Sequence, residues 1–264
     1  MRDSPTGREL KIARINIYHL YPEHLNLNGD RGNILALCER ARWHGLAVNL
    51  VPVQPGETID FGACDLLFMG GGGDAEQNMA AAELKKRRRD MQQAIEAGMV
   101  ILATGGSYQL FGHYYTTLRG ERMPGLELMD LYTEAGGKRL TGNIVVSCGL
   151  WDPPRTLVGF ENHAGRTCLG KGVQPLGRVL HGHGNNGSDN TEGAVYLHAI
   201  GSYMHGPLLP KNPWLTDYLL AKALAYRGQT FTFKELDQSF EEQAHQTAVR
   251  LAGSRLHSWR ARRA

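Results

Sequence analysis

The segment GMVILATGGSYQLFG, residues 98–112, constrains the fold of this chain more than any other. Residues 100–103 are apolar, as in a buried strand, and two glycines break this strand directly before a helix expected to begin near Tyr108. A strand, a sharp turn and a helix form an elbow, whose turn residue has a positive φ and stands exposed at the carboxyl edge of a sheet. The residue at this turn is Gly105.

An enzyme built on such an elbow would carry Ser or Cys at the turn as its nucleophile. Glycine suits a positive φ better than any residue with a Cβ. We therefore expect the fold to tolerate Gly105 and the covalent chemistry to be lost. Taken alone, this segment is also compatible with an ordinary glycine turn of an α/β protein.

The order of the remaining elements predicts an α/β fold with a doubly wound, mostly parallel sheet flanked by helices. A strand at 12–20, a helix at 34–44 and a strand at 47–53 form a β-α-β unit. We further expect strands at 66–69, 126–133, 140–148, 156–160 and 195–203, and helices at 75–97 and 213–226.

The chain of 264 residues predicts one large domain at 11–230 between a flexible leader at 1–10 and a basic C-terminal helix or tail at 231–264, helical from about Phe233. The net charge is only +3, and much of it comes from the last turns, so we expect no nucleic-acid partner. The arginines concerned are Arg250, Arg255, Arg260, Arg262 and Arg263.

Cysteine and histidine spacing gives no zinc pattern, and we expect no metal. The histidines at 181–187 favour a surface loop. We recognise no signal peptide and no apolar run long enough to cross a bilayer, so we expect a cytoplasmic protein that is not embedded in a membrane. Its reduced thiols are Cys38, Cys64, Cys148 and Cys168.

Four glycines, residues 70–73, follow the strand at 66–69 and precede Asp74. They lack the Gly-Lys-Ser/Thr of a phosphate loop, so they favour bare N–H groups that face an oxyanion. The elbow and His205, which ends a late strand, should lie at the same carboxyl edge. A nucleophile position, an oxyanion loop and a histidine base are the parts of an acyl-transfer site. The basic run at 85–89 we interpret as a solvated helix face.

The elbow, residues 105–112, resembles the Cys-Gly-Gly-Tyr-Gln-x-x-Gly of class I glutamine amidotransferases of the cobyric-acid-synthase-like (CobB/CobQ-like) branch, which have a flavodoxin-like fold. More narrowly, the chain is similar to the GatD-type subunit of lipid II isoglutaminyl synthase from about Ile15 to Gly228. This narrower resemblance rests on residues 25–27, 71–74, 139–142, 159–163, 184–186 and 203–207.

The resemblance implies a subunit that hydrolyses L-glutamine and passes ammonia to a MurT-type, Mur-ligase-like partner. That partner would use ATP and Mg²⁺ to amidate the D-glutamate of the stem peptide of lipid II during peptidoglycan synthesis. This chain itself would need no cofactor, and it would meet lipid II only through the partner.

The resemblance also implies roles for individual residues. Gly105 occupies the position of the nucleophilic Cys, and His205 matches the general base. Arg139 would hold the glutamine carboxylate, and Gln109 would line the substrate pocket. The oxyanion donors would be the backbone N–H groups of Gly72 and Gly106.

Two departures from the family pattern bear on activity. His205 is followed by Gly206 and Pro207 in place of x-Glu, so the resemblance implies that the partner supplies an aspartate as the third triad residue. The nucleophile is absent, and neither Thr104 nor Ser107 occupies the strained position. We therefore expect this chain not to hydrolyse glutamine at a useful rate.

Three hypotheses follow. The first is a glutaminase subunit that carries Cys→Gly at position 105, by engineering or by natural loss. The second is a non-catalytic scaffold or binding subunit for a Mur-ligase-like partner that uses free ammonia. The third is a nucleotide-binding α/β protein that uses the glycine loop at 70–73.

Overall fold

The structure is a computed structural model that describes the backbone of residues 13–261 and the side chains of residues 13–253. The predicted leader at 1–10 lies outside the described residues, as do Arg262 and Arg263. The side chains of Arg255 and Arg260 also lie outside the described part.

A six-stranded sheet forms the centre of the molecule, in the order β11-β12-β4-β3-β1-β2. Its neighbouring strands are parallel except for β11, which runs antiparallel to β12 at one edge. This arrangement confirms the predicted α/β class. The strands are β1 (Arg14–Leu20), β2 (Ala47–Val53), β3 (Leu66–Met69), β4 (Val100–Thr104), β11 (Ala194–Tyr196) and β12 (Ala199–Ser202).

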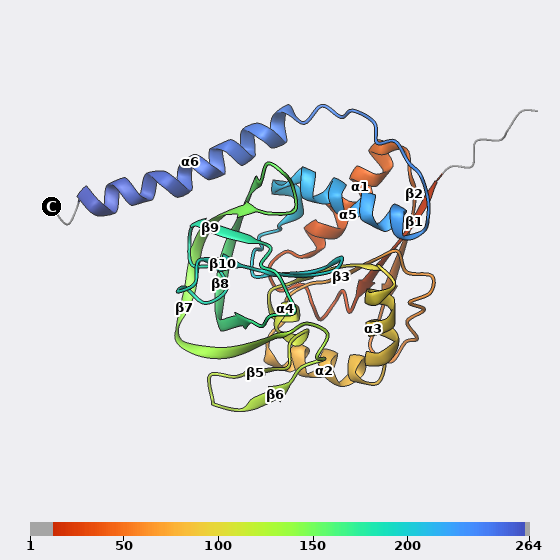
Figure 1. Ribbon diagram of the computed structural model, residues 1–264, viewed down its shortest axis with the longest axis horizontal. Helices are drawn as coiled ribbons and strands as arrows, with labels where there is room; N and C mark the ends of the chain where they lie inside the picture. Colours follow the sequence, from red (N-terminus) through yellow and green to blue (C-terminus); the bar gives the residue numbers. More distant parts are fainter. Residues whose placement is uncertain (1–12, 262–264) are drawn as a thin grey trace, which may run out of the picture.

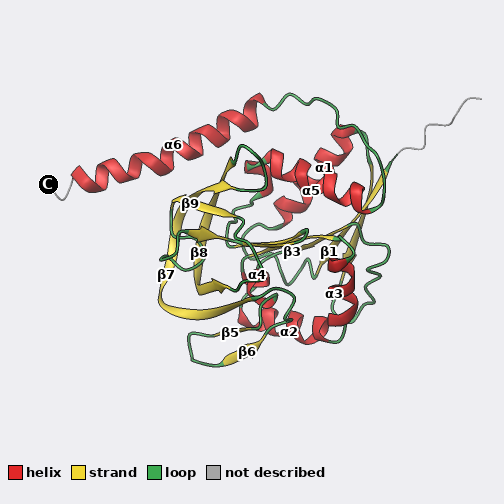
Figure 2. Cartoon of the chain, viewed as in Figure 1, coloured by secondary structure: helices red, strands yellow, loops and turns green. Residues whose placement is uncertain are grey.

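Helices cover both faces of this sheet (Figures 1 and 2). One face is covered by α1 (Arg31–His44) and α5 (Pro213–Tyr226), whose apolar residues share a core cluster with β1, β3 and β4. The other face is covered by α2 (Asp74–Lys85), α3 (Arg88–Glu96) and α4 (Gly106–Leu110). A short 3-10 helix, η1 (Leu209–Lys211), precedes α5. The sheet is therefore doubly wound, as predicted.

The strand register explains why the functional loops meet. Met69 of β3 pairs with Ala103 of β4, and Gly201 of β12 pairs with the same Ala103. The segments that follow β3, β4 and β12 thus leave the sheet at one edge, side by side. This edge is the carboxyl edge, where open α/β sheets bind their ligands.

A second sheet, in the order β10-β9-β7-β5-β6 with β8 paired to β7, was not predicted as a separate layer. It is antiparallel except where β5 meets β7. Its strands are β5 (Tyr114–Thr116), β6 (Arg122–Pro124), β7 (Leu131–Cys148), β8 (Arg155–Leu169), β9 (Gly177–His181) and β10 (Thr191–Glu192).

The β7–β8 hairpin corrects the predicted strands at 140–148 and 156–160. Both predicted segments are parts of longer strands, because β7 and β8 pair with each other across a bulge between Ala135 and Leu140. The polar residues 161–166, expected to follow a strand, therefore lie within β8. The histidine segment at 181–187 is a loop after its first residue, His181, which ends β9.

The predicted strand at 126–133 is wrong for its first five residues. The N–H groups of Leu126 and Leu128 donate to the carbonyls of Leu110 and Phe111 at the end of α4, and a strand begins only at Leu131. Alternate apolar residues do become buried here. Their backbone partner is a helix terminus, which needs donors for its last carbonyls.

The predicted helix at 75–97 is two helices, α2 and α3, with Arg87 in a non-helical conformation between them. A continuous helix would place like charges of the run 85–89 three and four residues apart, which is unfavourable. Leu84 before the break and Met91 after it are both fully buried in the core.

The predicted strand at 195–203 is a hairpin of β11 and β12. Its turn includes Leu197, which has φ +53, and His198. Apolar periodicity could not locate this turn because the residues on both sides of it are apolar.

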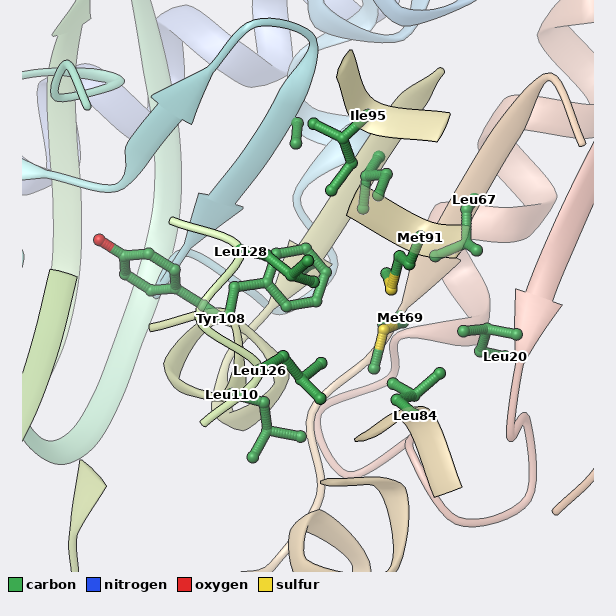
Figure 3. Close-up of a cluster of buried hydrophobic side chains, with 14 of the residues drawn as sticks. Leu20, Leu67, Met69, Leu84, Met91, Ile95, Tyr108, Leu110, Leu126 and Leu128 are labelled. Atoms are coloured by element: carbon green, nitrogen blue, oxygen red, sulfur yellow. The ribbon is translucent and has the colours of Figure 1, made fainter. Parts of the chain in front are cut away.

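The apolar core on the α2–α4 face fills the space between the sheet and these helices (Figure 3). Leu67 and Met69 of β3 lie near Leu84 and Met91 of the covering helices. Tyr108 of α4 has its ring in this cluster and points its hydroxyl away from it. That hydroxyl donates to Asn185 at 3.1 Å. The core thus anchors the helix that follows the elbow.

The last helix, α6 (Ser239–Ala261), begins later than the predicted Phe233. Phe231 and Phe233 instead pack in an extended segment against the α1–α5 core, where Phe233 meets the edge of His44. The helix then passes the second sheet (Figure 1). There Ala248, Val249 and Ala252 pack against Val145 of β7 and Val158 of β8. In the described part of the chain, no helix is long and apolar enough to span a membrane.

Candidate active site

The elbow has the backbone expected from the sequence. Gly105 follows β4 with φ +58, and its N–H donates to the Ser202 carbonyl at 2.9 Å. A Cβ at position 105 would lie 3.4 Å from Gly71 Cα and 3.8 Å from Asn28 Nδ2, which are ordinary van der Waals contacts. The site therefore has room for a side chain at the turn, facing the glycine loop.

The two hydroxyl groups beside the elbow are held inside the protein. Thr104 Oγ1 donates to Asp30 Oδ1 at 2.8 Å, and Ser107 Oγ donates to the Gly70 carbonyl at 2.5 Å. Both side chains are fully buried. Neither hydroxyl is placed to replace a missing nucleophile at position 105.

The glycine loop after β3 is fixed by Asp30. One carboxylate oxygen of Asp30 accepts the N–H of Gly71 at 2.9 Å, and the other accepts Thr104 Oγ1. In a phosphate loop the Gly71 N–H would be free to bind the anion, but here it donates to the Asp30 carboxylate. The negative charge of this buried carboxylate would also repel a phosphate. The geometry thus opposes the nucleotide-binding hypothesis.

The glycines predicted to supply the oxyanion donors, Gly72 and Gly106, both line one pocket. Within residues 13–253, no acceptor bonds the N–H of Gly72 or of Gly106. Gln77 Nε2 donates to the Gly72 carbonyl at 2.8 Å, and its amide fills the space where a Cβ of Gly106 would stand. A side chain at position 106 would therefore have to displace the buried amide of Gln77.

His205 lies just beyond β12, held by its backbone. Its N–H and carbonyl both pair with Phe160 of β8, at 3.0 and 3.1 Å, so the first and second sheets meet here. The side chain is buried, and Nε2 has no hydrogen-bond partner in the described part of the chain.

The environment of His205 favours the neutral imidazole. Burial, followed by the proximity of His163, Lys211 and Arg139, lowers the pKa of His205 from 6.5 to about 4, against an opposing effect of Glu161. A neutral ring can accept a proton, as a general base must. No carboxylate of the described residues bonds this ring, so the site holds no orienting acid of its own.

Arg139 lies on β7 and is fixed against β8. Its Nε donates to Asn162 Oδ1 at 2.8 Å and its Nη2 to the Asn162 carbonyl at 2.6 Å. One edge of the guanidinium is thereby occupied, and the edge that carries Nη1 is left for a ligand carboxylate. The antiparallel register that brings these residues together could not be read from the sequence.

Gln109 is positioned by a chain of buried hydroxyls. Its Nε2 donates to Tyr203 Oη at 3.0 Å, and Tyr203 Oη lies 2.6 Å from Thr167 Oγ1. Thr167 is in turn 2.7 Å from Thr133 across the β7–β8 pair. This network fixes the side chain of Gln109 at the pocket wall.

A single pocket of about 210 Å³ unites these groups. The structure therefore brings all the site residues predicted from the sequence into one cavity. They are Gly72, Gly105, Gly106, Gln109, Arg139 and His205.

Sequence reasoning assigned no role to several other lining residues. They include Asn28, Gln77, Asn162, His163 and Tyr203. Three of them lie in the segments 159–163 and 203–207 that carried the family resemblance, which was the available signal. Gln77 follows a glycine loop by one helical turn and had no such signal.

The cysteines and acidic residues suggest no metal centre in the described region, where no group of three or more His, Cys, Asp or Glu could hold an ion. All four cysteines are free thiols. Burial raises the pKa of Cys64 to well above its usual value and that of Cys148 to about 11. Neither lines the pocket.

An elbow, a glycine loop and a histidine at the carboxyl edge of a doubly wound sheet define the class I glutamine amidotransferase architecture. The chain belongs to the family of CobB/CobQ-like glutamine amidotransferase domains, whose family model matches residues 16–213. This match spans the elbow, the glycine loop and His205.

Two relatives match the chain over most of its length. A Staphylococcus aureus protein is 44% identical over 90% of this chain and 96% of its own. A Streptococcus pneumoniae protein is 39% identical over 80% of this chain and 81% of its own. Both are named subunit GatD of the glutamine-hydrolysing lipid II isoglutaminyl synthase. Cobyric acid synthase of Pelotomaculum thermopropionicum is 28% identical over 72% of this chain and 41% of its own.

Solved structures agree on the fold. PurLQS from Thermotoga maritima superimposes with a TM-score of 0.55 at 18% identity, over 82% of this chain and 99% of that chain. The glutaminase domain of Trypanosoma brucei CTPS, solved with bound acivicin, gives 0.50 at 11% identity, over 83% and 96%. At these identities the likeness concerns the architecture alone.

Proposed function

We propose that this chain is the glutamine-binding subunit of a lipid II isoglutaminyl synthase and donates ammonia in that complex when position 105 carries a cysteine. Two relatives with this name match most of the chain. The single observation that carries the proposal is the pocket that unites Gly105, the two candidate oxyanion amides, Arg139 and His205.

The chemistry follows from this arrangement with a cysteine at the elbow. His205 takes the thiol proton, and the thiolate attacks the side-chain carboxamide carbon of glutamine. The N–H groups of Gly72 and Gly106 stabilise the oxyanion of the tetrahedral intermediate. His205 then protonates the departing amino group, which leaves as ammonia, and water hydrolyses the thioester to give glutamate and the free thiol.

With Gly105 in place, the first step has no nucleophile. Arg139, Gln109 and His205 remain fixed at the pocket wall, so glutamine binding does not require the missing thiol. We therefore expect the chain as written to bind glutamine and to hydrolyse it at a negligible rate.

The partner completes the site in this proposal. His205 lacks an acid to orient its ring, so a MurT-type, Mur-ligase-like subunit would supply an aspartate. The same subunit would hold ATP and Mg²⁺ and use the ammonia to amidate the D-glutamate of the lipid II stem peptide. We place the complex in the cytoplasm, with lipid II reached through the partner.

A second candidate function is that of a non-catalytic scaffold for a partner that uses free ammonia. The observation that favours it is the internal bonding of Thr104 and Ser107, which leaves the elbow without a substitute nucleophile. This scaffold predicts amidation with ammonium ions and none with glutamine.

The test compares Gly105, Gly105→Cys and Gly105→Ala proteins, each co-purified with the Mur-ligase-like partner. We expect Gly105→Cys to release glutamate at least about 10³-fold faster than the other two, because loss of a nucleophile costs several orders of magnitude. Gly105→Ala is the matched control, since it adds the Cβ without the thiol. If no protein turns over but ammonium supports amidation, the scaffold is the function.

A further inference from the structure

His163 lies beside the groups proposed to bind glutamine, and none of the roles above uses it. It belongs to β8 and pairs with Leu140 of β7, next to the Arg139–Asn162 contact. Its side chain lines the pocket, although only 7% of it is exposed. A buried imidazole at a pocket wall needs a hydrogen-bonding explanation.

Two contacts fix the orientation and the tautomer of this ring. His163 Nδ1 is 2.9 Å from the Gly165 carbonyl, and a carbonyl can only accept, so Nδ1 carries the hydrogen. The ring lies flat on Tyr203, with ring centroids 3.7 Å apart and an interplanar angle of 3°. In the neutral ring, Nε2 therefore presents a lone pair in a fixed direction.

Nε2 of His163 has no hydrogen-bond partner among the described residues. The nearest acid is Glu161, whose Oε2 is 3.8 Å away, too far for a hydrogen bond. Glu161 is fully buried and accepts the N–H groups of His183 and Gly184 at 2.7 and 2.9 Å. A buried acceptor and a buried carboxylate thus lie close together without a donor between them.

A cationic N–H donor would satisfy this arrangement. An ammonium group has several donors, so it can bond Nε2 while its charge interacts with the Glu161 carboxylate, whose Oε2 is 3.8 Å from Nε2. Glutamine carries such a group one carbon away from the carboxylate assigned to Arg139. Arg139 on β7 would then bind the negative carboxylate of the amino acid, and His163 with Glu161 on β8 would bind its positive ammonium group.

We propose that His163, supported by the charge of Glu161, binds the α-ammonium group of the substrate. This makes the pocket specific for an α-amino acid amide over a plain carboxylic acid amide. The inference rests on the proposed glutamine-binding function. His163 acts here as a substrate-binding residue, and Glu161 as a positioning residue.

The experiment measures the binding of two ligands to the full chain by calorimetry. The ligands are L-glutamine and glutaramate, which is glutamine without its α-amino group. The chain with Gly105 is suited to this test, because neither ligand should be consumed. We expect the chain to prefer glutamine.

The decisive variant is His163→Phe, which keeps a flat ring for Tyr203 and removes both nitrogens. We expect it to weaken glutamine binding by about 10- to 100-fold, the size of a hydrogen bond to a charged group, and to change glutaramate binding little. His163→Gln, whose side-chain oxygen can stand near the Nε2 position, should recover part of the preference. His113→Asn, an exposed histidine outside the pocket, is the matched control.

The outcomes separate this inference from the function on which it rests. If the parent chain binds neither ligand, the proposed function fails and the inference fails with it. If the chain binds glutamine and His163→Phe keeps the same preference, the inference alone is wrong. Should His163→Phe not fold, Glu161→Gln must reduce the preference for glutamine, and an unchanged preference would overturn the inference.

Discussion

At the residue scale, the two adjacent glycines of the elbow differ in the space that a side chain would have. Gly105 has a positive φ, and a Cβ at this position would make only ordinary van der Waals contacts. Gly106 has no such space, because Gln77 fills it. Position 105 therefore has room for a nucleophilic side chain, whereas a side chain at 106 would have to displace the Gln77 amide.

The first prediction concerns Gly106→Ala. The added methyl group would overlap the Gln77 amide and displace it from the Gly72 carbonyl, so we expect the free energy of unfolding to fall by about 1–3 kcal/mol. Chemical denaturation measures this free energy of unfolding. Gly137→Ala is the control, because nothing lies within 4 Å of its Cβ position. Equal stability of the two variants would contradict the steric argument.

The second prediction concerns Arg139 in the Gly105→Cys protein. Arg139→Ala should raise the apparent KM for glutamine or abolish turnover, because it removes the proposed carboxylate ligand. Arg139→Lys should recover little, since an ammonium cannot bond Asn162 through two parallel N–H groups and also meet a carboxylate. Initial rates measured over a range of glutamine concentrations test this prediction. An unchanged KM and kcat would refute the role of Arg139 as the carboxylate ligand.

At the element scale, Asp30 joins three elements around the pocket. It stands at the start of α1, accepts the loop that follows β3, and accepts the hydroxyl at the end of β4. The relative position of the glycine loop and the elbow thus depends on one buried side chain. Sequence reasoning assigned no role to Asp30.

The third prediction follows from this contact. Asp30→Ala would leave the buried Gly71 N–H and Thr104 hydroxyl without their acceptor, at about 1–3 kcal/mol for each group. We expect a matching loss in the free energy of unfolding, and weaker glutamine binding. Asp60→Ala is the control, because Asp60 is exposed and does not line the pocket. Full stability of Asp30→Ala would show that the contact contributes nothing.

The bounds of a helix or strand were predictable from the sequence where a single local pattern of residues determined them. The bounds of β2, β3 and α5 match the predicted 47–53, 66–69 and 213–226, because each is an apolar segment between clear turn signals. The strand expected at 126–133 failed because the same alternation of apolar residues can be buried against the end of α4.

At the scale of the whole molecule, stability should depend on two buried histidines. Burial lowers the pKa values of His19 and His205 from 6.5 to about 4. The unfolded chain therefore takes up protons below about pH 6.5, while the folded chain stays neutral at these positions until about pH 4. Folding stability contributed by these groups is present above pH 6.5 and is lost as the pH falls toward 4.

The fourth prediction is a decline in the urea unfolding midpoint between pH 6.5 and pH 4. The double variant His19→Gln, His205→Gln should flatten this decline, whatever its stability at neutral pH. His113→Asn serves as the control for the replacement of an exposed histidine. An identical slope in the double variant would mean that other groups cause the acid sensitivity.

The sequence by itself determined the doubly wound sheet and the elbow at Gly105, because these depend on local periodicity and glycine positions. Its resemblance to a known family indicated the residues that meet at the pocket. Tertiary structure decided the rest. The second sheet, the Arg139–Asn162 contact and the placement of His163 over Tyr203 all depend on the pairing of β7 with β8. Such pairing joins residues far apart in the chain, and no local pattern fixes its register.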